Sequence, residues 1–221
     1  MLRRSVVSLF AAAALGTLAQ ANPTYIGSLN TVNDGLVGIG GWVSDDSHPV
    51  SLSWTVAQNN DLSWHYSYVF NRDGAQGNLS HLILETSQNL AHGDIRNATP
   101  NIQWSDPRWY APGPSNPNMP GSIYGVKFEP FPESFISTID FDSSRAPMWG
   151  DFFAKDGSVG GSLWNAGFTA IDPTSAVSSG SIDNHILVPD TQTSTIPAPG
   201  AILLGSIGVS LISWLRRRRV L

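Results

Sequence analysis

The chain has 221 residues, no cysteine and a formal net charge of −5, so disulfide bonds and thiolate chemistry are excluded. Residues 22–196 contain all 17 acidic residues and six of the 12 basic ones, a net charge of −11, which disfavours nucleic acid as a partner. Few charged residues together with many glycines, prolines and tryptophans indicate a β-rich extracellular domain.

Residues 1–21 have the order of a secretory signal peptide. Two arginines precede an apolar stretch over residues 6–18, and a small-X-small cleavage site follows at Ala19 and Ala21. We expect signal peptidase to cut after Ala21 and the remainder to be exported. A retained membrane anchor is the alternative, although the apolar stretch is short for a membrane span.

Alternation of apolar and polar residues predicts a series of strands. The clearest are residues 50–56 and 62–70, which a polar turn joins into an antiparallel hairpin with one aromatic face. Further strands are expected over residues 24–30, 36–43, 79–86, 123–129, 135–142, 149–155, 163–170 and 185–188, with a single helical turn within 90–97.

Prolines and glycines crowd residues 99–121, which predicts a long surface loop because proline gives no hydrogen-bond donor to a sheet. The same segment carries Trp104, Trp109 and Tyr110 among amide and carboxylate side chains. Flat aromatic rings beside such groups are typical of a glycan-binding surface. Packing against the end of the domain is the alternative for these three rings.

Eight to ten short strands with almost no helix predict an all-β fold, a single antiparallel β-sandwich of jelly-roll type over residues 22–189. A barrel is the alternative. Residues 190–196 are polar and lack hydrophobic periodicity, so they are expected to form a stalk between this ectodomain and the C-terminal segment.

Asp140 and Asp142 share one face of the expected strand over 135–142, about 7 Å apart. Two such carboxylates bind Ca²⁺ if Asp151, Asp156 or Asn165 adds oxygens. A glycoside hydrolase pair is a second interpretation, and a solvated acidic face is the third. No other cofactor is expected.

Nothing in the sequence spacing supports zinc or nucleophilic catalysis. The histidines follow no paired-ligand spacing, and no Gly-X-Ser-X-Gly motif is present. The histidines are His48, His65, His81, His92 and His185.

The C-terminal residues 197–221 combine three features in a fixed order. Pro197-Ala198-Pro199 comes first, and an apolar, glycine-containing stretch over 201–215 follows; as a helix it spans about 22 Å, against roughly 30 Å of hydrocarbon. Four arginines then stop the segment with its basic end in the cytoplasm. They are Arg216, Arg217, Arg218 and Arg219.

This order resembles the PEP-CTERM sorting tail, with Pro-Ala-Pro in place of Pro-Glu-Pro. Such tails are recognised by exosortase-type membrane transpeptidases in Gram-negative bacteria that make exopolysaccharide. The resemblance implies export, transient anchoring in the inner membrane by the C-terminal helix, cleavage near residues 197–199, and delivery to the cell surface or biofilm matrix. An ordinary single-span tail anchor is the alternative.

We therefore expect an exported, non-enzymatic surface or matrix protein that binds glycan. The alternatives are a hydrolase acting on polysaccharide through the carboxylate pair, and a purely structural matrix component. The expected partners are signal peptidase, an exosortase and exopolysaccharide.

Overall fold

The computed structural model describes residues 21–33, 35–43, 49–73, 75–158 and 160–189. The described chain is built mostly from antiparallel β-sheets with two short 3₁₀ turns, η1 (Gly40–Trp42) and η2 (His92–Asp94). This confirms the expected all-β class. No helix in the described ranges reaches the length and apolarity needed to cross a membrane. The expected signal peptide, apart from Ala21, the stalk and the sorting tail lie outside these ranges.

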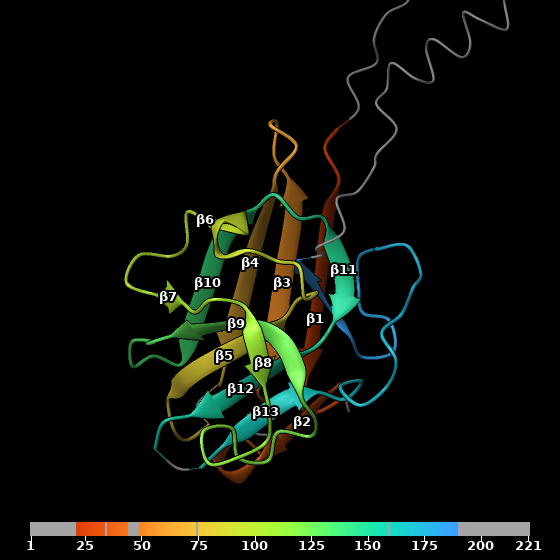
Figure 1. Ribbon diagram of the computed structural model, residues 1–221. Helices are drawn as coiled ribbons and strands as arrows, with labels where there is room; N and C mark the ends of the chain where they lie inside the picture. Colours follow the sequence, from red (N-terminus) through yellow and green to blue (C-terminus); the bar gives the residue numbers. More distant parts are fainter. Residues whose placement is uncertain (1–20, 34, 44–48, 74, 159, 190–221) are drawn as a thin grey trace, which may run out of the picture.

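Two large sheets face each other, with the five-stranded sheet behind the seven-stranded sheet in Figure 1. The five-stranded sheet has the order β1 (Thr24–Asn30), β3 (Ser51–Gln58), β4 (Trp64–Asn71), β10 (Ile136–Ser143) and β6 (Ile95–Arg96). The seven-stranded sheet has the order β2 (Leu36–Ile39), β13 (Ser162–Asn165), β12 (Phe152–Asp156), β5 (Leu79–Glu85), β9 (Ile123–Glu129) and β7 (Gln103–Trp104), with β8 (Arg108–Tyr110) also paired to β9. A small third sheet pairs β11 (Pro147–Gly150) with β14 (Ile186–Pro189).

The main core lies between the two large sheets and is rich in aromatic rings. Tyr66 stacks on Phe141 with ring centroids 5.2 Å apart, and Phe141 stacks on Phe128 of the facing sheet at 5.4 Å. Period-two alternation supplies these rings, because every second residue of β4 and β10 is buried. Trp54, Trp64 and Trp149 are buried in the same core.

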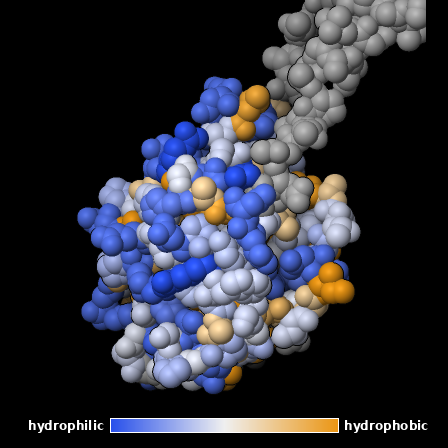
Figure 2. Space-filling view, viewed as in Figure 1, coloured by the Kyte–Doolittle hydropathy of each residue, from blue (hydrophilic) through white to orange (hydrophobic). Residues whose placement is uncertain are grey.

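A second hydrophobic cluster covers the outer face of the seven-stranded sheet. Ile83 and Phe153 point away from the main core and pack against Tyr110, Met119 and Ile123. Strand β5 is therefore buried on both faces, because the segment over residues 108–121 folds over it. Elsewhere Figure 2 shows this side of the molecule as mainly hydrophilic, with apolar residues scattered singly.

Two sequence predictions are corrected here. The expected loop over residues 99–121 contains the short strands β7 and β8, because both pair with the free edge of β9. The expected strand over 149–155 is split at Asp151, whose backbone N–H bonds the Glu85 side chain at 2.9 Å. The chain changes sheets at that point, from β11 to β12.

Candidate functional site

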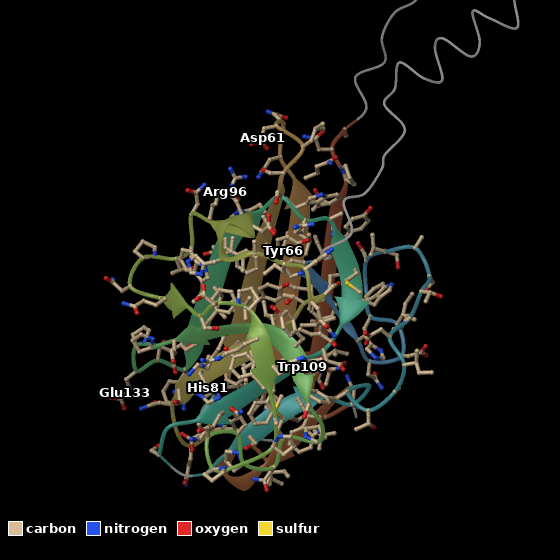
Figure 3. All side chains as sticks on the ribbon, in the orientation of Figure 1. Asp61, Tyr66, His81, Arg96, Trp109 and Glu133 are labelled. Atoms are coloured by element: carbon tan, nitrogen blue, oxygen red, sulfur yellow. The ribbon has the colours of Figure 1, made fainter. Side chains whose placement is uncertain are left out.

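A groove of about 260 Å³ opens beside strands β8 and β9. Its wall contains aromatic rings and its polar groups include carboxyl, amide and hydroxyl side chains. Figure 3 labels Trp109 beside the β8–β9 pair. Its lining includes Glu85, Gln88, Trp109, Tyr124, Trp149 and Asp172.

Trp109 is the exposed ring of this groove. The residue is 58% exposed, although it lies on a paired strand opposite Tyr124. The two rings meet edge to face, with centroids 5.7 Å apart and planes at 79°. The Tyr124 hydroxyl donates to the carbonyl of Pro107 at 3.1 Å, so the partner ring is fixed. Trp109 is therefore an exposed apolar surface held on a rigid element.

The other two residues of the expected aromatic surface lie elsewhere. Tyr110 is only 6% exposed, and its hydroxyl lies 2.6 Å from the Ser105 hydroxyl. This corrects the prediction for Tyr110: adjacent residues of a strand point to opposite faces, so Trp109 and Tyr110 cannot share one surface. Trp104 is half-buried, packs against the main core and stacks on His92 at 5.2 Å.

Asp140 and Asp142 share one half-buried face of β10, as predicted. The Asp142 carboxylate accepts hydrogen bonds from Asn97 at 2.7 Å and Asn59 at 3.5 Å, and lies 2.8 Å from Nδ1 of His65. Burial alone would raise the pKa of Asp142, but the hydrogen bonds from Asn97, His65 and Asn59 outweigh burial and lower the pKa. These contacts give Asp142 a structural role in joining strands and loops.

A different acidic group lies where β11, β12, β13 and β14 meet. One ligand atom each from Asp151, Asp172 and His185 lies within 4.8 Å of the other two. Nε2 of His185 is 3.6 Å from Oδ1 of Asp151 and 3.5 Å from Oδ1 of Asp172. Asn165 donates to Asp151 Oδ1 at 2.6 Å. Asp151 and Asn165, expected as supplementary ligands beside Asp140, thus belong to this separate group.

The environment of this group disfavours negative charge. Burial raises the pKa of Glu85 to about 8, and the neighbouring carboxyls of Asp172 and Asp151 add to the shift. Burial also raises the pKa of Asp151 and of Asp172, against the opposing effect of His185. Four ionisable groups therefore share a region that excludes most water.

Sequence reasoning missed Asp172, and it did not connect His185 with any ligand. Asp172 follows β13 in an irregular segment, and His185 follows Asp183 and Asn184, which adopt positive φ of 48° and 60°. An Asp-Asn pair shortly before a strand is a turn signal, and that turn places His185 immediately before β14. Ala21 is exposed and precedes β1, whereas Ala19 and residues 197–199 and 216–219 lie outside the described residues.

Comparison of this chain with protein-family models, with curated proteins and with solved structures gives no match.

Proposed function

We propose that this chain is an exported, non-enzymatic surface protein whose β domain binds a glycan in the groove beside Trp109. The observation that carries the proposal is the exposure of Trp109, which is fixed on a paired strand next to a polar groove. An exposed indole costs free energy in water and offers a flat apolar face to the C–H face of a sugar ring.

The groove supplies the second part of sugar recognition. Gln88, Glu85 and Asp172 place amide and carboxyl groups beside the ring, where they meet sugar hydroxyls. A volume of about 260 Å³ is below the roughly 300–1,000 Å³ of pockets that enclose drug-sized ligands. It suits one sugar unit, with the rest of a polymer lying across the surface. The net charge of −11 over residues 22–196 favours neutral or basic polymers over acidic ones.

The test is binding of the full-length chain to cellulose, starch, chitin and chitosan, by pull-down and affinity electrophoresis. Trp109→Ala is expected to weaken binding about tenfold, since half-covering a large ring contributes roughly 1–1.5 kcal/mol. Phe135→Ala is the matched control, because Phe135 is also 58% exposed but does not line the groove. Equal binding by the wild type and Trp109→Ala, or equal losses in both variants, contradicts the proposal.

Export and sorting form a separate part of the proposal, supported by the sequence features of residues 1–21 and 197–221. Mass spectrometry of surface protein is expected to show a chain that begins at Asn22 and lacks Arg216 to Arg219. An intact C-terminus in the mature protein contradicts exosortase processing. This result does not depend on whether the domain binds glycan.

The finer fold assignment is a sandwich of jelly-roll type. The chain passes between the two large sheets at β1–β2, β2–β3, β4–β5, β5–β6, β6–β7 and β9–β10, and such crossings support it. The hydrolase alternative at Asp140 and Asp142 has less support, since the Asp142 carboxylate is already engaged by Asn97 at 2.7 Å and lies 2.8 Å from Nδ1 of His65.

A further inference from the structure

The buried group at the β11–β14 end of the domain contains an imidazole nitrogen with no hydrogen-bond partner. The His185 side chain is 0% exposed, and its Nε2 makes no hydrogen bond. Nδ1 of the same ring faces the carbonyl oxygen of Ile182 at 3.3 Å. Because a neutral imidazole carries one N–H, this contact places the proton on Nδ1 and leaves the lone pair on Nε2.

That lone pair points at two carboxylates. Nε2 lies 3.6 Å from Asp151 Oδ1 and 3.5 Å from Asp172 Oδ1. Both distances exceed the 2.7–3.2 Å range of an N–H···O hydrogen bond. Three electron-pair donors that face one another inside a protein repel unless a cation lies between them. Within the described residues, His185 is the one basic side chain that lies within 4.0 Å of the Asp151 or Asp172 carboxylate.

We propose that Asp151, Asp172 and His185 bind one divalent transition-metal ion, for which zinc is the best match. Zinc is held by imidazole nitrogen and carboxylate oxygen at about 2.0–2.2 Å, so ligand atoms around a tetrahedral ion lie about 3.3 Å apart. The two distances from Nε2 are close to that value. Calcium and magnesium take oxygen ligands and fit an imidazole poorly.

The surroundings of the three side chains have the features of a metal site's outer shell. Asn165 donates to Asp151 at 2.6 Å and accepts the backbone N–H of Phe152 at 3.0 Å, so it fixes the carboxylate. The contact between His185 Nδ1 and Ile182 fixes the tautomer that presents Nε2. Such partners orient metal ligands and tune affinity.

The backbone also makes room for the imidazole. A Cβ at Gly167 would lie 2.7 Å from Cε1 and 2.8 Å from Nδ1 of His185, so only glycine fits against the ring. The Asp172 side chain is 34% exposed and lines the groove. Three protein ligands with one side open to solvent leave a coordination position for water or an added ligand.

The test uses the full-length chain, without a histidine tag, after treatment with a chelator. Zinc titration followed by dialysis and elemental analysis is expected to give one zinc per chain, and calorimetry is expected to show Ca²⁺ binding at least 100-fold more weakly. Zinc is also expected to raise the unfolding temperature, because it binds the folded state. Cobalt in place of zinc is expected to give the intense visible bands of a four-coordinate site.

Asp172→Asn and His185→Gln are expected to lower zinc affinity at least 30-fold. Asp172→Asn is the decisive variant, because the Asp172 side chain is partly exposed and its replacement leaves the core unchanged. The matched control is Asp142→Asn, which alters a second His-Asp pair at 2.8 Å on the other sheet and is expected to keep full zinc binding.

Zinc binding that is equal in the wild type and Asp172→Asn overturns the proposal, as does a wild type that retains no zinc. Zinc content is measured without polysaccharide, so a failure of the zinc proposal does not bear on glycan binding at Trp109.

Discussion

His81 gives the domain a pH dependence whose size follows from its surroundings. Figure 3 labels this residue on the seven-stranded sheet, where it is 5% exposed. Its Nε2 lies 3.1 Å from Oδ1 of Asn116, whose amide nitrogen donates to the carbonyl of Ala111. Because that amide nitrogen is occupied, Oδ1 faces the ring, and His81 must carry its proton on Nε2.

A second proton on His81 is costly in the folded state. Burial, and then the positive charge of Lys127, lower the pKa of His81 from 6.5 to about 4. The unfolded chain binds this proton near pH 6.5 and the folded chain only near pH 4. Between these values the unfolded state holds more protons, so stability falls as the pH falls through this window. A shift of this size corresponds to about 3 kcal/mol.

His81→Gln removes the titrating group and keeps an amide donor for Asn116. Urea unfolding of the full-length wild type and variant between about pH 4 and pH 7 gives the free energy of unfolding at each pH. The wild type is expected to lose about 3 kcal/mol more than His81→Gln on acidification. The difference between the two proteins cancels the titration of Glu85 and Asp151, which both share.

A wild-type profile parallel to that of His81→Gln would refute the reasoning. NMR titration of the His81 ring provides an independent check. Its ring protons are expected to keep the chemical shifts of neutral imidazole down to about pH 5; a transition near pH 6.5 would show that burial does not control this residue.

Three further substitutions test packing by urea unfolding. Gly167→Ala is expected to destabilise the domain by about 1–3 kcal/mol, because the added methyl would lie 2.5 Å from the Asp183 carbonyl oxygen and 2.7 Å from Cε1 of His185; unchanged stability would show that both neighbours move aside. Tyr68→Phe removes a buried hydrogen bond of 2.7 Å to the Leu187 carbonyl and is expected to lower the free energy of unfolding by about 1–3 kcal/mol. An unchanged free energy of unfolding would contradict this expectation and indicate that water replaces the hydroxyl. Phe141→Ala opens a cavity in the aromatic stack and is expected to cost about 3–5 kcal/mol; a loss below about 1 kcal/mol would contradict the described core.

Local sequence patterns predict the long strands because alternation and burial have the same period. The expected strands over 24–30 and 123–129 coincide with β1 and β9, and the 50–56 and 62–70 pair forms the antiparallel β3–β4 hairpin. Strands β7 and β8 were missed because two or three residues are too few to show a period. Their pairing depends on the edge of β9, which is a tertiary feature.

The candidate site was predictable only in part, for a similar reason. Trp109 was singled out because its segment combines aromatic rings with amide and carboxylate side chains, and in the structure it is exposed. Tyr110, its neighbour, was grouped with it because the segment was expected to be a loop, where adjacent side chains need not alternate. Asp172 and His185 meet Asp151 because an irregular segment packs against two sheets. No spacing of residues in the sequence indicates such a tertiary contact.

The buried bond between Tyr68 and Leu187 has a consequence for the order of folding. Strand β14 is buried at every residue and joins the main core beside β4, more than a hundred residues earlier in the chain. The main core is therefore complete only when this last described strand has packed against it. Because contacts so distant in sequence form slowly, the chain is expected to complete its core only after residues 186–189 have been synthesised.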